Sequence, residues 1–133
     1  MQRRKFIALS ALGGAALGFT GVNCSHRSKA FYSILDKPQQ LSYICDAKTI
    51  REIGMDYRLQ TPAETDGDKL EELLTTDFAG KPVSSSSDNL YIQTLINQKI
   101  KHDFETGNTV VVRGWILAVT EARQCALLFV NSQ

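Results

Sequence analysis

The chain contains few of the residues from which catalytic and metal sites are usually built. Its 133 residues include two histidines, three cysteines and one tryptophan. No glycine pattern matches a dinucleotide or phosphate cradle, and no serine lies in the glycine-flanked elbow of a hydrolase nucleophile. His102 is followed by Asp103, but neighbouring side chains on a strand point to opposite faces and would not act together. The sequence therefore predicts no catalytic residue, no metal site and no cofactor in this chain.

A long membrane-spanning run is also missing, and a shorter apolar run stands near the N-terminus. Residues 6–22 carry no charge, but they include four glycines and fall short of the roughly 20 residues of a spanning helix. A positive head followed by a weakly apolar segment is typical of an export signal. Arg3 and Arg4, followed closely by Phe6, resemble the twin-arginine translocation signal, whose pathway carries folded proteins. We therefore expect the twin-arginine translocase to deliver this protein to the periplasm.

The signal has a small-residue end that predicts where it is cleaved. Ser28 and Ala30 stand three and one positions before a cut after Ala30, which would divide the chain into a signal, 1–30, and one small domain, 31–133. An uncleaved signal would instead keep contact with the membrane. Cys24 is a further candidate, as a lipid-attachment cysteine, although the residues before it lack the usual pattern.

Cleavage would change the charge balance of the chain. Residues 1–30 hold five of the 15 basic residues and none of the 14 acidic ones, so the remainder has ten basic and 14 acidic residues and a net charge of −4. Nucleic-acid binding needs clustered lysines and arginines that face the phosphates. A mildly acidic domain without such a cluster argues against a nucleic-acid partner.

Cys45 and Cys125 are the cysteines of the predicted domain. An oxidising compartment would allow a disulfide between them. Both also lie among apolar residues, as buried free cysteines do, so the sequence leaves the two alternatives open.

Helical patterns account for the first half of the domain. A start at residues 36–38 predicts a helix with Leu41 and Ile44 on its apolar face. A second helix is expected to begin with Thr49 as its capping residue and to end at Thr61, which precedes a proline.

Two further helices and a change of pattern follow. Asp68 and Asp88 are predicted N-caps on either side of a loop over residues 80–87. Residues 109–112 are rich in β-branched side chains and predict a strand, with residues 102–104 as its candidate partner in a hairpin.

The C-terminal segment is expected to form a last helix, with Thr120 as its capping residue. The predicted fold class is thus mainly α: a small helical domain with a short β-strand or hairpin near the C-terminus.

Trp115 lies where the predicted strand gives way to this last helix. It could be a core residue that seals the junction or an anchor in a partner interface, where tryptophan and arginine are enriched. Glu121 and Arg123 are candidates for the same interface, with a helix-start charge and a solvated arginine as the alternatives.

The segment at residues 114–123 resembles the C-terminal sequence of small exported subunits that accompany flavin-dependent, GMC-type sugar or alcohol dehydrogenases. The segment at residues 53–58, followed by Pro62 and Glu64, is similar in the same way, while Ala118 departs from the hydroxyl residue expected at its position. This resemblance implies that the small subunit bears the export signal and that a larger oxidoreductase subunit holds FAD. It carries over no catalytic residue.

The sequence thus predicts an exported, non-catalytic small subunit that escorts or stabilises a cofactor-bearing periplasmic oxidoreductase. The alternative is a stand-alone periplasmic or membrane-anchored helical interaction domain. An enzyme with an unrecognised site is a third interpretation, which no constellation of residues supports.

Overall fold

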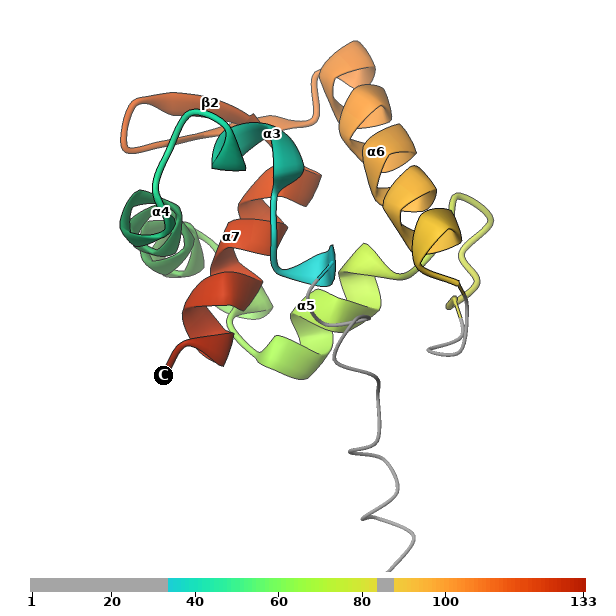
Figure 1. The fold of residues 1–133 in the computed structure, drawn as a ribbon, viewed down its shortest axis with the longest axis horizontal. Helices are drawn as coiled ribbons and strands as arrows, with labels where there is room; N and C mark the ends of the chain where they lie inside the picture. The colour runs from blue at the N-terminus through green and yellow to red at the C-terminus, as the bar shows by residue number, and fades with distance from the viewer. Residues whose placement is uncertain (1–33, 84–87) are drawn as a thin grey trace, which may run out of the picture.

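The computed structural model describes residues 34–83 and 88–133 (Figure 1). The predicted signal residues Arg3, Arg4 and Phe6, the cleavage after Ala30 and the candidate lipid site Cys24 lie outside the described residues.

The described chain is mainly helical with a two-stranded antiparallel hairpin near its C-terminus, which confirms the predicted fold class. In chain order the elements are α3 (Gln39–Ser42), α4 (Ala47–Gln60), the 3-10 turn η1 (Pro62–Glu64), α5 (Gly67–Leu74), α6 (Asn89–Thr106), β1 (Thr109–Val112), β2 (Trp115–Ala118) and α7 (Val119–Asn131).

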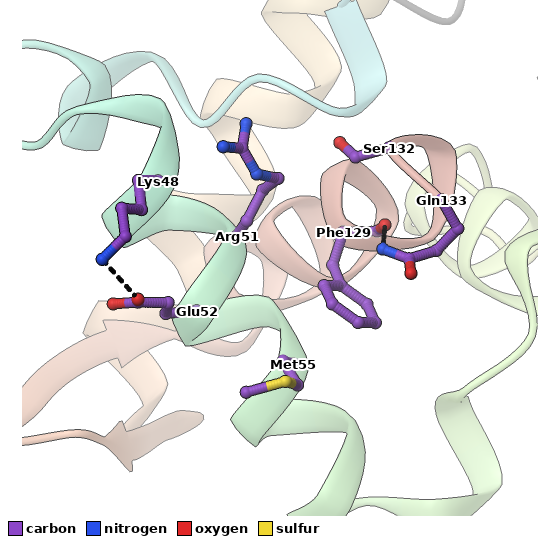
Figure 2. A pocket seen from close by; sticks show the side chains of 7 residues that line it. All are labelled: Lys48, Arg51, Glu52, Met55, Phe129, Ser132 and Gln133. Carbon is purple, nitrogen blue, oxygen red and sulfur yellow. Dashed lines mark hydrogen bonds and ion pairs between the residues drawn. The ribbon is translucent and has the colours of Figure 1, made fainter.

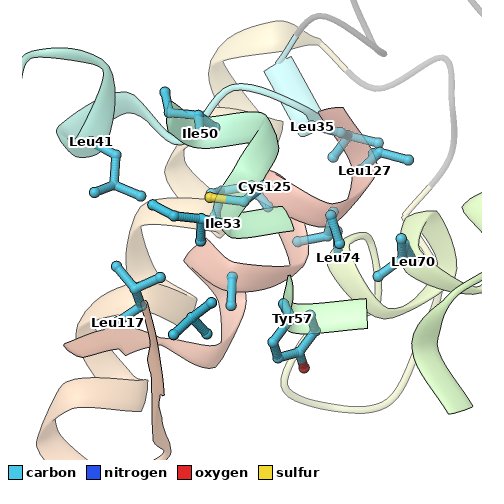
Figure 3. Close-up of a cluster of buried hydrophobic side chains, with 14 of the residues drawn as sticks. Leu35, Leu41, Ile50, Ile53, Tyr57, Leu70, Leu74, Leu117, Cys125 and Leu127 are labelled. Atoms are coloured by element: carbon cyan, nitrogen blue, oxygen red, sulfur yellow. The ribbon is translucent and has the colours of Figure 1, made fainter. Parts of the chain in front are cut away.

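Helix α7 lies at the centre of the fold, with α4, α5, α6 and the hairpin packed around it (Figure 1). Its apolar residues face the core, where Leu127 and Cys125 are fully buried. Figure 3 shows them among side chains from α4, α5 and β2. The buried residues elsewhere in the described chain include Leu35, Leu41, Ile50, Ile53, Leu70, Leu74, Ile92, Ile96, Val112 and Leu117. The predicted apolar stripes therefore meet in one core around α7.

α4 and α7 approach each other closely at Gly54. A Cβ at this position would clash with the carbonyl oxygen of Cys125 and would lie 2.8 Å from the backbone nitrogen of Ala126. Only a residue without a side chain lets the two backbones approach this closely.

The hairpin differs from the predicted pairing. β1 pairs with β2, in a register that sets Val111 opposite Ile116, rather than with residues 102–104. Those residues belong to α6, which continues to Thr106 and ends at Gly107 with a left-handed φ of 75°. The strand that follows is then free to turn back through the two-residue loop before β2.

Several predicted helix starts are shifted by two or three residues. Asp46 caps α4 in place of Thr49, whose backbone N–H donates to the Asp46 carboxylate at 2.8 Å. Asp66 caps α5 in place of Asp68. Asp88 caps α6 as predicted.

The predictions for the first and the last helix of the domain were also wrong in part. α3 is a single turn that ends at Ser42, so Ile44 lies beyond it and is 67% exposed instead of buried. α7 begins at Val119, so Thr120 is inside the helix and is not its N-cap.

Candidate functional site

Arg123 is held by an ion pair and is not a solvated side chain. Its Nε donates to Oε1 of Glu64 at 2.8 Å, and its Nη2 donates to Oε2 at 3.0 Å. The Tyr57 hydroxyl donates to the same Oε1 at 2.8 Å. These side chains come from α7, η1 and α4, so the cluster joins three elements around one carboxylate. We refer to Tyr57, Glu64 and Arg123 as the ion-pair cluster.

The electrostatics of the ion-pair cluster fix the protonation of each member. Hydrogen bonds from Arg123 lower the pKa of Glu64. Burial, followed by the hydrogen bond to Glu64, raises the pKa of Tyr57 to about 12. Burial opposes the charge on Arg123, but the hydrogen bonds and charge of Glu64 outweigh it, and the pKa of Arg123 is raised. At neutral pH the carboxylate therefore stays ionised and the phenol stays protonated, so the cluster is poorly suited to proton transfer.

A shallow cavity of about 300 Å³ opens beside the ion-pair cluster. Its volume is at the lower limit of the range for small-molecule sites. The cavity is lined by Tyr57, Gln60, Thr61, Glu64, Asn108, Thr109, Val110, Val119 and Arg123.

Glu121 is buried at the start of α7, and its place in a partner interface stays a prediction. It is 5% exposed, and its Oε1 accepts a hydrogen bond from the Ala118 backbone N–H at 3.1 Å. Burial raises the pKa of its carboxyl group. Its role at this helix start is to satisfy a backbone donor.

Asp103 completes the same helix start from a different element. Its Oδ2 accepts hydrogen bonds from the backbone N–H of Thr120 at 2.8 Å and from the Thr120 hydroxyl at 2.6 Å. Its Oδ1 accepts from Nδ2 of Asn108 at 3.0 Å. His102 remains exposed, so Asp103 and His102 do not form an acid–base pair.

Trp115 is half-buried on the inner side of the hairpin, where it packs against the core opposite Val112. The structure therefore favours the core interpretation of this residue. The outer side of the hairpin presents Val111 and Ile116, which are 59% and 68% exposed and pair across the strands. We call this pair the hairpin face. The sequence could have indicated the hairpin face, because side chains along a strand alternate between its two sides. Ile116 therefore points away from the side that Trp115 and Leu117 share.

The hairpin face is braced against α4. Nε2 of Gln60 donates to the Val111 carbonyl oxygen at 3.2 Å. Arg113, at the hairpin turn, forms ion pairs with Asp56 at 3.1 Å and Glu52 at 3.5 Å. These contacts link the hairpin to α4 on the side of the exposed pair.

Cys45 and Cys125 are both free thiols in the structure. Burial raises the pKa of each thiol, and Cys125 is fully enclosed. A disulfide between them is one of the two alternatives that the sequence leaves open, and it stays untested.

The chain matches no family model, no curated protein and no solved structure. Within residues 34–83 and 88–133, no group of three or more His, Cys, Asp or Glu side chains could hold a metal ion. Among the helices of this same part of the chain, none has the length and apolar character needed to cross a membrane.

Proposed function

We propose that this protein is an exported, non-catalytic small subunit that binds and escorts a larger, cofactor-bearing oxidoreductase in the periplasm. The flavin would be held by the larger subunit. Two sequence features support the proposal: the twin-arginine pattern at Arg3 and Arg4, and the resemblance of residues 114–123 to small subunits of flavin-dependent dehydrogenases.

The observation that carries the proposal is the hairpin face. Val111 and Ile116 expose 59% and 68% of their surface on a hairpin fixed to α4. Ile116 lies within the segment that carries the resemblance. Single exposed apolar residues are ordinary, but a preformed apolar pair on a braced element can bind a partner with little loss of conformational entropy.

In this proposal the ion-pair cluster has a structural role. Its charged groups are paired with one another, and Tyr57 is 2% exposed. Such a cluster fastens η1 to α7 instead of presenting a reactive group to a substrate.

The test is to place a charge in the hairpin face. We expect Ile116→Asp to weaken binding of the larger subunit about thirtyfold, since burying a lone carboxylate at an interface centre costs on the order of 2 kcal/mol or more. The measurement is the amount of large subunit that co-purifies with the tagged chain from its native cells. Leu90→Asp is the matched control, because Leu90 is 73% exposed at the far end of α6.

Two outcomes would contradict the proposal. An unchanged yield of large subunit with Ile116→Asp would remove the hairpin face from the interface. A colourless wild-type protein that purifies as a single band would favour the stand-alone interaction domain, whereas flavin absorbance with a large second band would support the escort function.

A further inference from the structure

Glu52 shows how a carboxylate is accommodated at the surface of this protein. Figure 2 shows it on the rim of a pocket beside α4, where it pairs with Lys48 at 3.0 Å. It also lies 3.5 Å from a guanidinium nitrogen of Arg113 at the hairpin turn. Glu52 is therefore a carboxylate with opposite charges beside it and water around it.

Glu121 lacks both of these surroundings. It is 5% exposed, at the junction where β2 ends and α7 begins. The partner of its carboxylate among the described residues is the backbone N–H of Ala118, at 3.1 Å. Burial in a medium of low dielectric constant penalises the ionised form of a carboxyl group and not the protonated form.

Asp103 places a second carboxylate at the same helix start. Its Oδ2 accepts from the backbone N–H of Thr120 at 2.8 Å, so the two carboxylates bind N–H groups only two residues apart. Asp103 also accepts hydrogen bonds from the Thr120 hydroxyl and from Asn108. Like charges at this separation repel each other, and Glu121 has fewer hydrogen bonds to stabilise its charge.

Cations on the neighbouring elements are bound to other groups. Lys99 of α6 donates through Nζ to two backbone carbonyl oxygens at the end of α5. Arg123 of α7 is paired with Glu64, and Arg113 of the hairpin turn is paired with Asp56. These contacts direct the three positive charges away from Glu121.

The remaining titratable groups on the buried sides of the packed elements are neutral or distant. The Cys125 thiol lies one turn further along α7, and burial raises its pKa, so it carries no charge at neutral pH. Tyr57 of α4 is bound within the ion-pair cluster. Glu71 of α5 lines a cavity with Asn131, near the opposite end of α7. The charge that faces Glu121 is therefore the negative charge of Asp103.

We propose that Glu121 is a buried proton-binding site, which holds the junction of the hairpin and α7 more firmly in mild acid than at neutral pH. The protonated carboxyl group still accepts from the Ala118 N–H, and protonation removes the repulsion from Asp103. This inference concerns the folding of the chain and does not rest on the proposed function.

The direction of the pH effect follows from the folded state. Burial raises the pKa of Glu121 and the charge of Asp103 adds to the rise, while the hydrogen bond from Ala118 opposes it. The stabilisation is thus fully present below the unfolded value near 4.5 and is lost as the pH rises through the higher folded value.

The test is Glu121→Gln in the full chain, which keeps an acceptor for the Ala118 N–H and removes the charge. We expect the unfolding equilibrium constant at pH 7 to be at least about threefold smaller in the variant than in the wild type. At pH 5 the two proteins should differ by a smaller factor. Denaturant titrations followed by circular dichroism measure both constants.

Glu105→Gln is the matched control. Glu105 is an exposed residue of α6 that pairs with Lys101 at 3.6 Å, and its replacement should change the constant less than about twofold at either pH. A Glu121→Gln variant that is less stable than the wild type to the same extent at pH 5 and pH 7 would overturn the proposal.

A second measurement needs no variant and decides the case if Glu121→Gln does not fold. The side-chain carboxyl carbon of Glu121 in the folded wild-type protein, followed by NMR, should titrate at a higher pH than in the urea-unfolded chain. Titration at the same or a lower pH would overturn the proposal.

Discussion

At the scale of single residues, Gly54 sets the distance between α4 and α7. An added Cβ would meet backbone atoms of Cys125 and Ala126, which cannot move aside as a flexible side chain would. We expect Gly54→Ala to lower the free energy of unfolding by at least about 2 kcal/mol, because overpacking against backbone forces the helices apart. Urea denaturation followed by circular dichroism measures this change.

Gly67 provides the matched control for that substitution. A Cβ there would approach only a side-chain carbon of Val130, at 3.3 Å, at the first residue of α5. Gly67→Ala should change the free energy of unfolding by less than about 1 kcal/mol in either direction. Equal losses for the two variants would show that helix packing at Gly54 is not the cause.

Glu64 makes the stability of the protein depend on pH. Its pKa is lowered in the folded state by Arg123, so its contribution is fully present above the unfolded value near 4.5 and is lost as the pH falls through the lower folded value. Glu64→Gln should therefore reduce the free energy of unfolding at pH 7 by about 1–3 kcal/mol, with a smaller difference at pH 3. Denaturant titrations at the two pH values measure it.

The control for Glu64 is an exposed carboxylate in a similar pair. Glu72 pairs with Lys69 at 3.0 Å, but its side chain is 62% exposed. Glu72→Gln should change stability by less than about 0.5 kcal/mol at both pH values. A Glu64→Gln penalty that does not shrink in acid would mean that the side chain acts by packing and not through its charge.

At the scale of elements, the sequence predicts the long helices well and their first residues less well. The stripe that includes Ile92 and Ile96 is periodic over many residues, so its buried face could be predicted before the structure. A helix start depends on a single capping contact, and both Asp46 and Thr49 have side chains that can cap a helix. Local sequence does not decide between neighbouring caps.

One of the contacts that cap the start of α7 could not be predicted locally because it comes from another helix. Asp103 is 17 residues from Thr120 in the sequence, and its carboxylate accepts hydrogen bonds from the backbone N–H and the hydroxyl of Thr120. The same limit applies to the ion-pair cluster, where Glu64 and Arg123 are 59 residues apart. Arg123 has the sequence context of a surface arginine, and only the tertiary fold brings a carboxylate to it.

The hairpin shows how a wrong end for helix α6 alters the predicted orientation of strand residues. Ending α6 before Thr106 leaves residues 102–104 as the apparent strand partner and makes Trp115 a junction residue. With β2 as the partner, Trp115 faces the core and Ile116 faces outward. Trp115 and Ile116 therefore face opposite sides of the hairpin, because neighbouring strand residues alternate in direction.

At the scale of the whole molecule, export is the property that the first thirty residues are expected to control. Replacing Arg3 and Arg4 with lysines should leave the protein in the cytoplasm, since lysine keeps the charge but lacks the fixed guanidinium fork. Cell fractionation and immunoblotting measure the periplasmic share. A single Lys5→Gln variant controls for loss of charge in the head, and normal export of the double variant would contradict the twin-arginine interpretation.

The central position of α7 also determines how the described part of the chain comes apart. The helix contacts α4, α5, α6 and both strands, and Gly54 meets it across a wide separation in sequence. Detaching any one of these neighbours exposes the buried apolar surface of α7 to water. The conformational entropy that the detached segment gains is too small to offset this cost. Unfolding is accordingly expected to be all-or-none, without a separately stable fragment for proteases to release.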